Sequence, residues 1–218
     1  MATEAGPVPV RRNAEQKRAA VAVAAMTEFQ DNGYVGTSID SIAVRAGVSK
    51  PTIYRYFGSK QELFLTVVGE RLVQAYSGLE AKAAQITRLR VRAGLIEYLR
   101  HWVEIAVVDR SILGLRRLVT GEVHRFPELG ERWAAINIEH ADAPLCEALR
   151  VFAARGDLEV DDFSVAMRQL IAMTLGSVQL IATFRPRYPL GDELDGIVES
   201  GVDTFLSRFG GAGGVPTK

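Results

Sequence analysis

The residues from Thr37 to Leu63, TSIDSIAVRAGVSKPTIYRYFGSKQEL, most constrain the fold because they divide into short helices separated by glycines. Thr37 is predicted to cap the first of these helices, and Asp40, three residues later, completes a capping box. Gly47 is predicted to end that helix, since glycine adopts the positive φ of a helix C-terminus without steric cost. Two short helices joined by such a tight turn are typical of a helix-turn-helix.

The second helix of this pair is predicted to have one apolar face and one polar face. Ser49 is expected to cap it, and Pro51 falls in its first turn, where a missing N–H has no cost. Ile53 and Phe57, four residues apart, form an apolar stripe that faces the preceding helices. The opposite, polar face carries Lys50, Thr52, Tyr54 and Arg55.

The residue types on this polar face are suited to DNA. Arginine offers a two-pronged donor to guanine O6 and N7, and threonine reaches a base edge or the thymine methyl, so we expect Thr52 and Arg55 to read sequence. Hydroxyl, ammonium and helix N-terminal groups bind phosphates, which position the protein without reading bases. Candidates for that role are Lys50, Tyr54, Tyr56 and Lys60. For the two tyrosines, the alternative is packing as half-buried aromatics.

These motifs resemble the N-terminal DNA-binding region of the TetR family of bacterial transcription regulators. The resemblance covers about residues 14–65 and includes the frame of Ala25, Phe29, Gly33 and Tyr34 that precedes the stretch above. The positions that match the family's operator contacts are Thr37, Ser49, Lys50, Thr52, Tyr54, Arg55, Tyr56 and Lys60. Position 55 varies within the family, so the resemblance implies that Arg55 selects the operator.

Apolar residues elsewhere recur at spacings of three and four, which predicts an all-α fold of about nine helices. We expect a three-helix DNA-binding domain over residues 11–60 and a larger helical domain for effector binding and dimerisation over 61–209. Residues 1–10 and 210–218 have the composition of a disordered arm and tail. Pro144 predicts a kink or break in a long helix. The longer helices are expected over 86–107, 109–124, 127–155, 161–184 and 191–209.

Charge and composition narrow the function classes. The formal net charge is zero, which argues against nonspecific binding to polyanions, but residues 1–60 hold eight Lys/Arg and five Asp/Glu. The single cysteine, Cys146, excludes an internal disulfide and fits a reducing compartment. The first 20 residues lack the apolar core of a secretory signal, and the longest apolar run, 169–184, is short for a membrane span. We therefore expect a cytoplasmic protein with no membrane partner.

The resemblance also implies partners for the larger domain. The helices at 161–184 and 191–209 would form a four-helix bundle with a second copy of the chain, the alternative being an intramolecular pair of core helices. An unknown small-molecule effector would bind among the middle helices. The candidates for that pocket, each of which is otherwise plain core, are Trp102, Ile105, Leu118, His124, Trp133, Asn137, Met167 and Gln179.

Nothing in the sequence predicts catalysis. His101, His124 and His140 are too far apart for a helical metal pair, and the chain has no Gly-rich phosphate loop or nucleophile elbow, so we expect no catalytic residue, metal or cofactor. The sequence favours a repressor that binds a pseudo-palindromic operator as a homodimer and is released by its effector. The alternative is a helical small-molecule-binding or adaptor protein with a non-functional helix-turn-helix.

Overall fold

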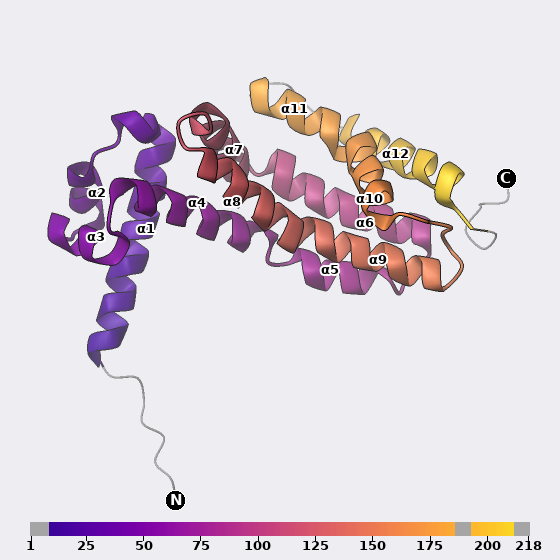
Figure 1. Ribbon diagram of the computed structural model, residues 1–218, viewed down its shortest axis with the longest axis horizontal. Coiled ribbons are helices and arrows are strands. Elements are labelled where there is room, and N and C mark those ends of the chain that lie inside the picture. Colours follow the sequence, from indigo (N-terminus) through magenta and orange to yellow (C-terminus); the bar gives the residue numbers. More distant parts are fainter. Residues whose placement is uncertain (1–8, 186–192, 212–218) are drawn as a thin grey trace, which may run out of the picture. The chain divides into compact units, whose positions relative to one another are not determined.

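The computed structural model describes residues 9–185 and 193–211, in which all the regular structure is helical apart from one isolated bridge between Leu158 and Gly210. The expected all-α fold is confirmed. The expected disorder of the arm and tail falls almost wholly on residues 1–8 and 212–218, which lie outside the described ranges. The helices, shown in Figure 1, are α1 (Pro9–Gly36), α2 (Ile39–Ala46), α3 (Lys50–Phe57), α4 (Lys60–Tyr76), α5 (Leu79–Ile86), α6 (Val91–Val103), α7 (Arg110–Glu122), α8 (Pro127–Asn137), α9 (Ala143–Ala154), α10 (Phe163–Ile171), α11 (Ser177–Phe184) and α12 (Glu193–Phe209).

The chain forms two compact units. One comprises Met1–Arg71 together with Leu118–Leu129, and the other comprises Leu72–Arg117 together with Gly130–Lys218. The end of α7 and the start of α8 therefore belong with the N-terminal helices. The domain boundary at residue 60 stays a prediction.

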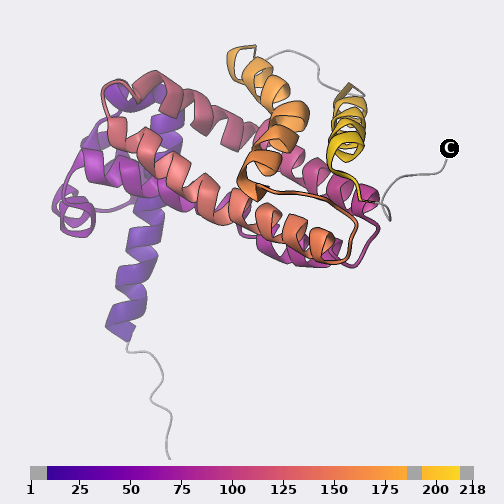
Figure 2. The ribbon, with the colours of Figure 1, turned by 45° about the vertical axis from the view of Figure 1, so that its right-hand side comes forward.

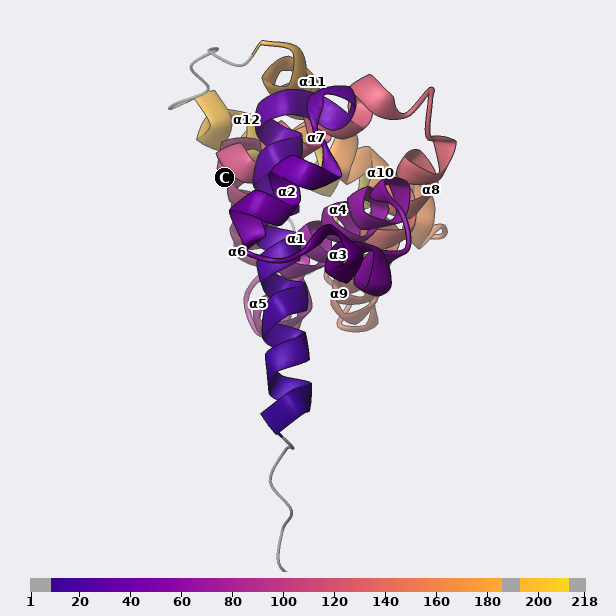
Figure 3. The ribbon, with the colours of Figure 1, turned by 90° about the vertical axis from the view of Figure 1, so that its left-hand side faces the viewer.

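In the first unit, α1, α2 and α3 pack against one another (Figure 3). Their shared core contains Phe29, Ile42 and Ile53, which are almost completely buried. Gly33 bends α1 with a φ of 69°, and Gly47 ends α2 with a φ of 64°. Both are left-handed conformations that glycine adopts without a Cβ clash, and the helix end expected at Gly47 is confirmed.

The residue that caps α2 differs from the expectation. Ser38 is the N-cap: its Oγ accepts from Ser41 N at 2.9 Å, and Ser41 Oγ accepts from Ser38 N at 3.3 Å. The predicted box of Thr37 with Asp40 is wrong because the Thr37 hydroxyl turns into the unit, where it donates to Glu28 O at 2.9 Å. A buried hydroxyl needs such a partner, so packing decides which of two adjacent residues caps the helix.

Ser49 precedes α3 with the extended backbone of an N-cap, as expected. Its side chain nevertheless makes no capping bond to a backbone amide, because its Oγ pairs with Thr52 Oγ1 at 2.9 Å. Ser59 does cap α4, since its Oγ accepts from Glu62 N at 3.0 Å. These two helix starts therefore use serine in different ways.

In the second unit, α6 packs against α5 and α12, and α5 also packs against α9, as Figure 2 shows. The core between these helices includes Tyr98, Phe152 and Phe205, each fully buried. Large aromatic side chains supply much of the apolar area that such a core buries.

Short π-helical turns interrupt three long helices of this unit. They are η1 (Glu104–Val108) after α6, η2 (Ile138–Asp142) between α8 and α9, and η3 (Ala172–Gly176) between α10 and α11. The second confirms the break expected at Pro144: proline lacks an N–H, and the ladder shifts just before it, so that Ala143 N bonds Ile138 O.

The run from α10 to α11, Phe163–Phe184, is long and apolar enough to cross a membrane by length and composition alone. Its inner face, including Leu170, Leu175 and Val178, is buried in the core of the second unit. The run is therefore a core element of this folded unit.

Candidate DNA-binding surface and effector cavity

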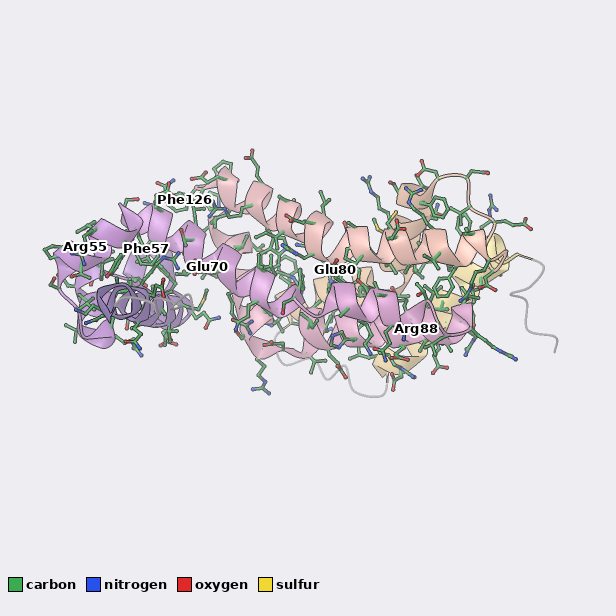
Figure 4. All side chains as sticks on the ribbon, turned by 90° about the horizontal axis from the view of Figure 1, so that it is seen from below. Arg55, Phe57, Glu70, Glu80, Arg88 and Phe126 are labelled. Atoms are coloured by element: carbon green, nitrogen blue, oxygen red, sulfur yellow. The ribbon has the colours of Figure 1, made fainter. Side chains whose placement is uncertain are left out.

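The two faces predicted for α3 are present. Ile53 and Phe57 are buried, with exposures of 1% and 6%, whereas Tyr54 is 45% exposed and Arg55 points to solvent. Figure 4 labels Arg55 and Phe57 on this helix. The helix is thus anchored on one side and offers polar groups on the other.

Lys50 at the start of α3 is linked to α2. Its Nζ donates to Asp40 Oδ2 at 2.8 Å, and that hydrogen bond raises the pKa of the exposed ammonium group. Lys50 is therefore protonated at neutral pH and already has a carboxylate partner. A phosphate that approached it would have to compete with Asp40.

Arg55 is oriented by its neighbour. Its guanidinium lies 5.1 Å from the centre of the Tyr56 ring, and Nη2 is 3.4 Å from the Tyr56 hydroxyl. Stacking of this kind limits the rotamers of a long side chain and leaves donors of the guanidinium fork free to reach outward. Tyr56 is half-buried and supports Arg55 from the side.

Lys60 lies in an aromatic cluster of the first unit. Its Nζ is 4.4 Å from the centre of the Tyr34 ring, and burial, followed by the nearby Arg125, lowers its pKa. The Tyr34 ring in turn packs edge-on against Phe126, 4.5 Å away between ring centres (Figure 4 labels Phe126). The cation is therefore half-buried against an aromatic face.

Thr37 contributes to this surface differently from the other candidates. The whole residue is 3% exposed, and its hydroxyl donates to Glu28 O and Gly33 O. Little of Thr37 is therefore open to a phosphate. Whether any of the eight predicted residues touches DNA stays a prediction.

An ion pair that sequence reasoning missed holds α2 on α1. Arg45 Nε donates to Glu28 Oε1 at 2.6 Å, and Asn32 Nδ2 donates to the other carboxylate oxygen at 3.2 Å. Hydrogen bonds from Arg45 and then Ser41 lower the pKa of Glu28. One signal was available: Glu28 lies seven residues after Val21, on the apolar stripe of its helix.

A cavity of about 660 Å³ lies in the second unit between α5 and the η2–α9 segment. This volume is in the range of small-molecule sites. Glu80, labelled in Figure 4, lies on the α5 side, and Glu139 and Glu147 lie on the other. Tyr76 also lines the cavity. None of the eight predicted pocket residues is among its lining residues.

Three of the predicted pocket residues nevertheless gather beside Tyr76. Tyr76 Oη donates to Asn137 Oδ1 at 3.0 Å, and Asn137 Nδ2 donates to Trp133 O at 2.8 Å. Burial raises the pKa of Tyr76, whereas the neighbouring Arg116 and Trp102 oppose this shift. The structure thus brings Trp102, Trp133 and Asn137 together with two residues that the sequence did not single out.

The other predicted pocket residues lie elsewhere. Met167 is buried in the core and Ile105 packs against it, while Gln179 lies on α11. Leu118 and His124 belong to the first unit. Arg116 was not predicted as a pocket residue. Its spacing gave a weak indication of burial, because it lies four residues after Ile112 and three before Val119 on an apolar helix face.

Among the described residues, no group of three or more His, Cys, Asp or Glu side chains is arranged to hold a metal ion.

Comparison with known families decides the class of protein. The pattern of bacterial regulatory proteins of the tetR family matches residues 22–67, and that of the AefR-like transcriptional repressor C-terminal domain matches residues 93–211, more than half of the chain. The chain belongs to the TetR family. It is therefore a helix-turn-helix transcriptional regulator, and TetR-family regulators bind DNA and small-molecule effectors.

Curated relatives match over part of their length. The transcriptional activator FasR of Mycolicibacterium smegmatis is 39% identical over 83 residues, which are 37% of this chain and 38% of FasR. The transcriptional repressor SCO4008 of Streptomyces coelicolor is 39% identical over 62 residues, 28% of this chain and 32% of that protein. The match thus spans only about a third of the length of these relatives.

Solved structures match over nearly the whole chain. A TetR-family regulator from Mesorhizobium loti superposes with a TM-score of 0.84 at 28% identity, covering 90% of this chain and 98% of its own. The flavonoid-responsive regulator FrrA superposes with a TM-score of 0.69 at 27% identity and the same coverage. FadR of Bacillus subtilis in complex with stearoyl-CoA, at 18% identity and a TM-score of 0.63 over 91% of this chain and 99% of its own, shares the fold.

Proposed function

We propose that this regulator is a cytoplasmic repressor that binds a pseudo-palindromic operator as a homodimer and leaves it when a small-molecule effector binds. The observation that carries the proposal is that α3 has two different faces. Ile53 and Phe57 are buried on one face, and Lys50 and Arg55 are exposed on the other. The match to the AefR-like repressor pattern supports repression. The proposed function involves no catalysis, no metal and no cofactor.

On DNA, α3 lies in the major groove. Thr52 and Arg55 meet base edges, while the lysines and tyrosines around them hold phosphates. Two copies of α3 read two half-sites about 34 Å apart, which requires two-fold symmetry. The exposed, protonated Lys50 supports this assignment of roles.

The homodimer is formed by the α10–α11 run and α12. Large apolar side chains are exposed on this run, with Val165 at 48%, Leu180 at 62% and Phe184 at 66%. Beside them is an apolar hollow of about 580 Å³ lined by Met173, Glu193, Gly196, Ile197, Ser200, Gly201 and Thr204. Exposed apolar surface of this kind marks an interaction site, and a second copy of the chain covers it in the dimer.

The effector binds in the second unit, where the cavity beside Tyr76 has the size of a small-molecule site. An effector releases DNA only if it binds more tightly to the conformation that does not fit the operator. The coupling free energy between the two sites then appears as a loss of operator affinity.

A mobility-shift assay on the DNA upstream of its own gene tests this proposal. A salt-sensitive, sequence-selective shift is expected, and Arg55→Ala should reduce its selectivity. Arg88→Ala, an exposed arginine of the second unit, is the matched control and should leave the shift unchanged. If no sequence-selective shift is found, the helix-turn-helix is non-functional and the chain is a helical small-molecule-binding protein.

A further inference from the structure

We propose that the effector is an aromatic carboxylate whose acid group is bound by Trp102 and Arg116 in the interior of the second unit. This rests on the proposed function, because it names the chemical class of the effector. The site consists of Tyr76, Trp102, Arg116, Trp133 and Asn137, which we call the Trp102 cluster. It contains donors and aromatic surfaces from α4, α6, α7 and α8.

The first observation is a buried donor. Trp102 is 3% exposed, and its Nε1–H makes no hydrogen bond of good geometry among the described residues, although it lies near enough to the Tyr76 hydroxyl to lower the pKa of that group. The indole is held on one side by the Tyr98 ring, edge-on at 6.1 Å between ring centres. Native proteins rarely bury a donor without an acceptor, because the group loses water and gains nothing. An acceptor atom of a ligand would complete this site.

The second observation is the guanidinium of Arg116. It lies 5.9 Å from the centre of the Trp133 ring and forms a hydrogen bond with Tyr76. A guanidinium presents five donors in one plane, so it matches the two oxygens of a carboxylate even while one donor is used. Trp102 and Arg116 both lower the pKa of the Tyr76 hydroxyl, so their donor groups lie near the same oxygen atom.

The charges around the cluster favour an anion. Arg117 lies next to Arg116 and lowers its pKa, after the larger effect of burial. Asp142 of η2 is the acidic group that raises the pKa of Tyr76. Burial raises the pKa of Asp142 itself, and the positive charge of Arg168 lowers it. Positive charge near the cluster therefore comes from Arg116 and from the adjacent Arg117, whose own guanidinium donates to Thr183 O and Ala182 O.

The cavity determines how the effector is oriented. Tyr76 lines the cavity and also belongs to the cluster, so a ligand in the cavity meets the cluster at this residue. Glu80, Glu139 and Glu147 line the cavity and are exposed. They repel an acid group beside them, so the carboxylate is expected to lie toward the cluster. The aromatic body then packs against the rings at Tyr76.

Intrinsic fluorescence reads this site directly, because the only two tryptophans of the chain, Trp102 and Trp133, both lie in the cluster. The full chain is titrated with benzoate, 3-phenylpropanoate and biphenyl-4-carboxylate, each beside its neutral amide and the corresponding primary amine. At least one acid should change the emission saturably and bind about tenfold or more tightly than its amide, because a charged hydrogen bond is lost in the amide. If no acid is preferred over its amide and amine, the proposal is overturned.

Variants separate the two donors. Arg116→Gln should remove the preference for the acid, while Arg132→Gln, an exposed arginine on α8, should keep it. Trp102→Phe keeps a ring and removes the N–H, so acid binding should weaken severalfold. If Arg116→Gln does not fold, Arg116→Lys is used instead, because it retains the charge without the planar fork. Arg116→Lys should bind the acid more weakly than wild type does. Acid binding that is unchanged in the Arg116 and Trp102 variants overturns the assignment.

The same samples are tested in the mobility-shift assay, which distinguishes this proposal from the proposed function. A DNA shift without acid binding leaves the regulator assignment standing and overturns the effector class. Acid binding without a DNA shift supports the Trp102 cluster as a site and overturns the proposed function.

Discussion

Arg45 Nε on α2 donates to Glu28 Oε1 on α1 at 2.6 Å, which ties the first two helices of the DNA-binding unit together. Glu28 is 6% exposed, while Arg45 lies nearer the surface. Because α3 packs on α1 and α2, this pair helps to set the position of the helix that is proposed to read DNA.

Glu28→Gln should change the pH dependence of stability. The pKa of Glu28 is lowered in the folded state, so its stabilising contribution is present above the unfolded pKa of about 4.3 and is lost as the pH falls through the folded pKa. Wild type should therefore lose more thermal stability than Glu28→Gln on going from about pH 6 to about pH 3.

Thermal unfolding followed by circular dichroism across that range measures the difference. Glu15→Gln, an exposed glutamate on the same helix, is the control and should follow wild type. Identical pH profiles for wild type and Glu28→Gln would contradict a stabilising role for the Glu28–Arg45 pair.

The two serine caps should differ in their effect on stability. Ser38→Ala removes the reciprocal bonds with Ser41 and should lower the free energy of unfolding by about 1 kcal/mol. Ser49→Ala should lower it less, because the Ser49 hydroxyl bonds an exposed hydroxyl of Thr52 and no backbone amide. Urea unfolding of the two variants decides this, and equal losses would show that Ser49 caps α3 in solution.

Arg55 and Lys50 should affect DNA binding in different ways. Arg55→Ala should cost about 1 to 3 kcal/mol at particular base pairs of the operator and relax selectivity there. Lys50→Ala should weaken binding to all sequences alike and reduce the salt slope by about one. Fluorescence anisotropy on a set of operator variants at several salt concentrations separates the two, and a uniform loss for Arg55→Ala would make Arg55 a phosphate contact.

Leu180→Arg should convert the proposed dimer to a monomer, because it places a charge in the apolar surface that a second copy is proposed to cover. Ile138→Arg is the matched control, since Ile138 is 59% exposed on η2, away from the proposed interface. Sedimentation measures the mass of each variant, and operator affinity should fall with the loss of the dimer. A Leu180→Arg protein that stays dimeric would place the interface elsewhere.

Much of the DNA-binding unit could be predicted from local signals. The turn at Gly47, the buried Ile53 and Phe57 and the exposed Arg55 all follow from residues within about ten positions of one another. Such features depend on backbone preference and helical periodicity, which short sequences carry by themselves. The cap of α2 was less predictable, because Thr37 and Ser38 are both good caps, and the buried carbonyl of Glu28 decided between them.

The proposed effector site shows the opposite case. Tyr76 meets Asn137, a residue 61 positions away in the sequence, and Arg116 lies over Trp133 from a different helix. The sequence by itself determined an all-helical chain with a two-faced α3, since both depend on periodicity along one helix. Only the tertiary structure decided which polar residues of distant helices share an interior, because their burial and their partners depend on how those helices pack.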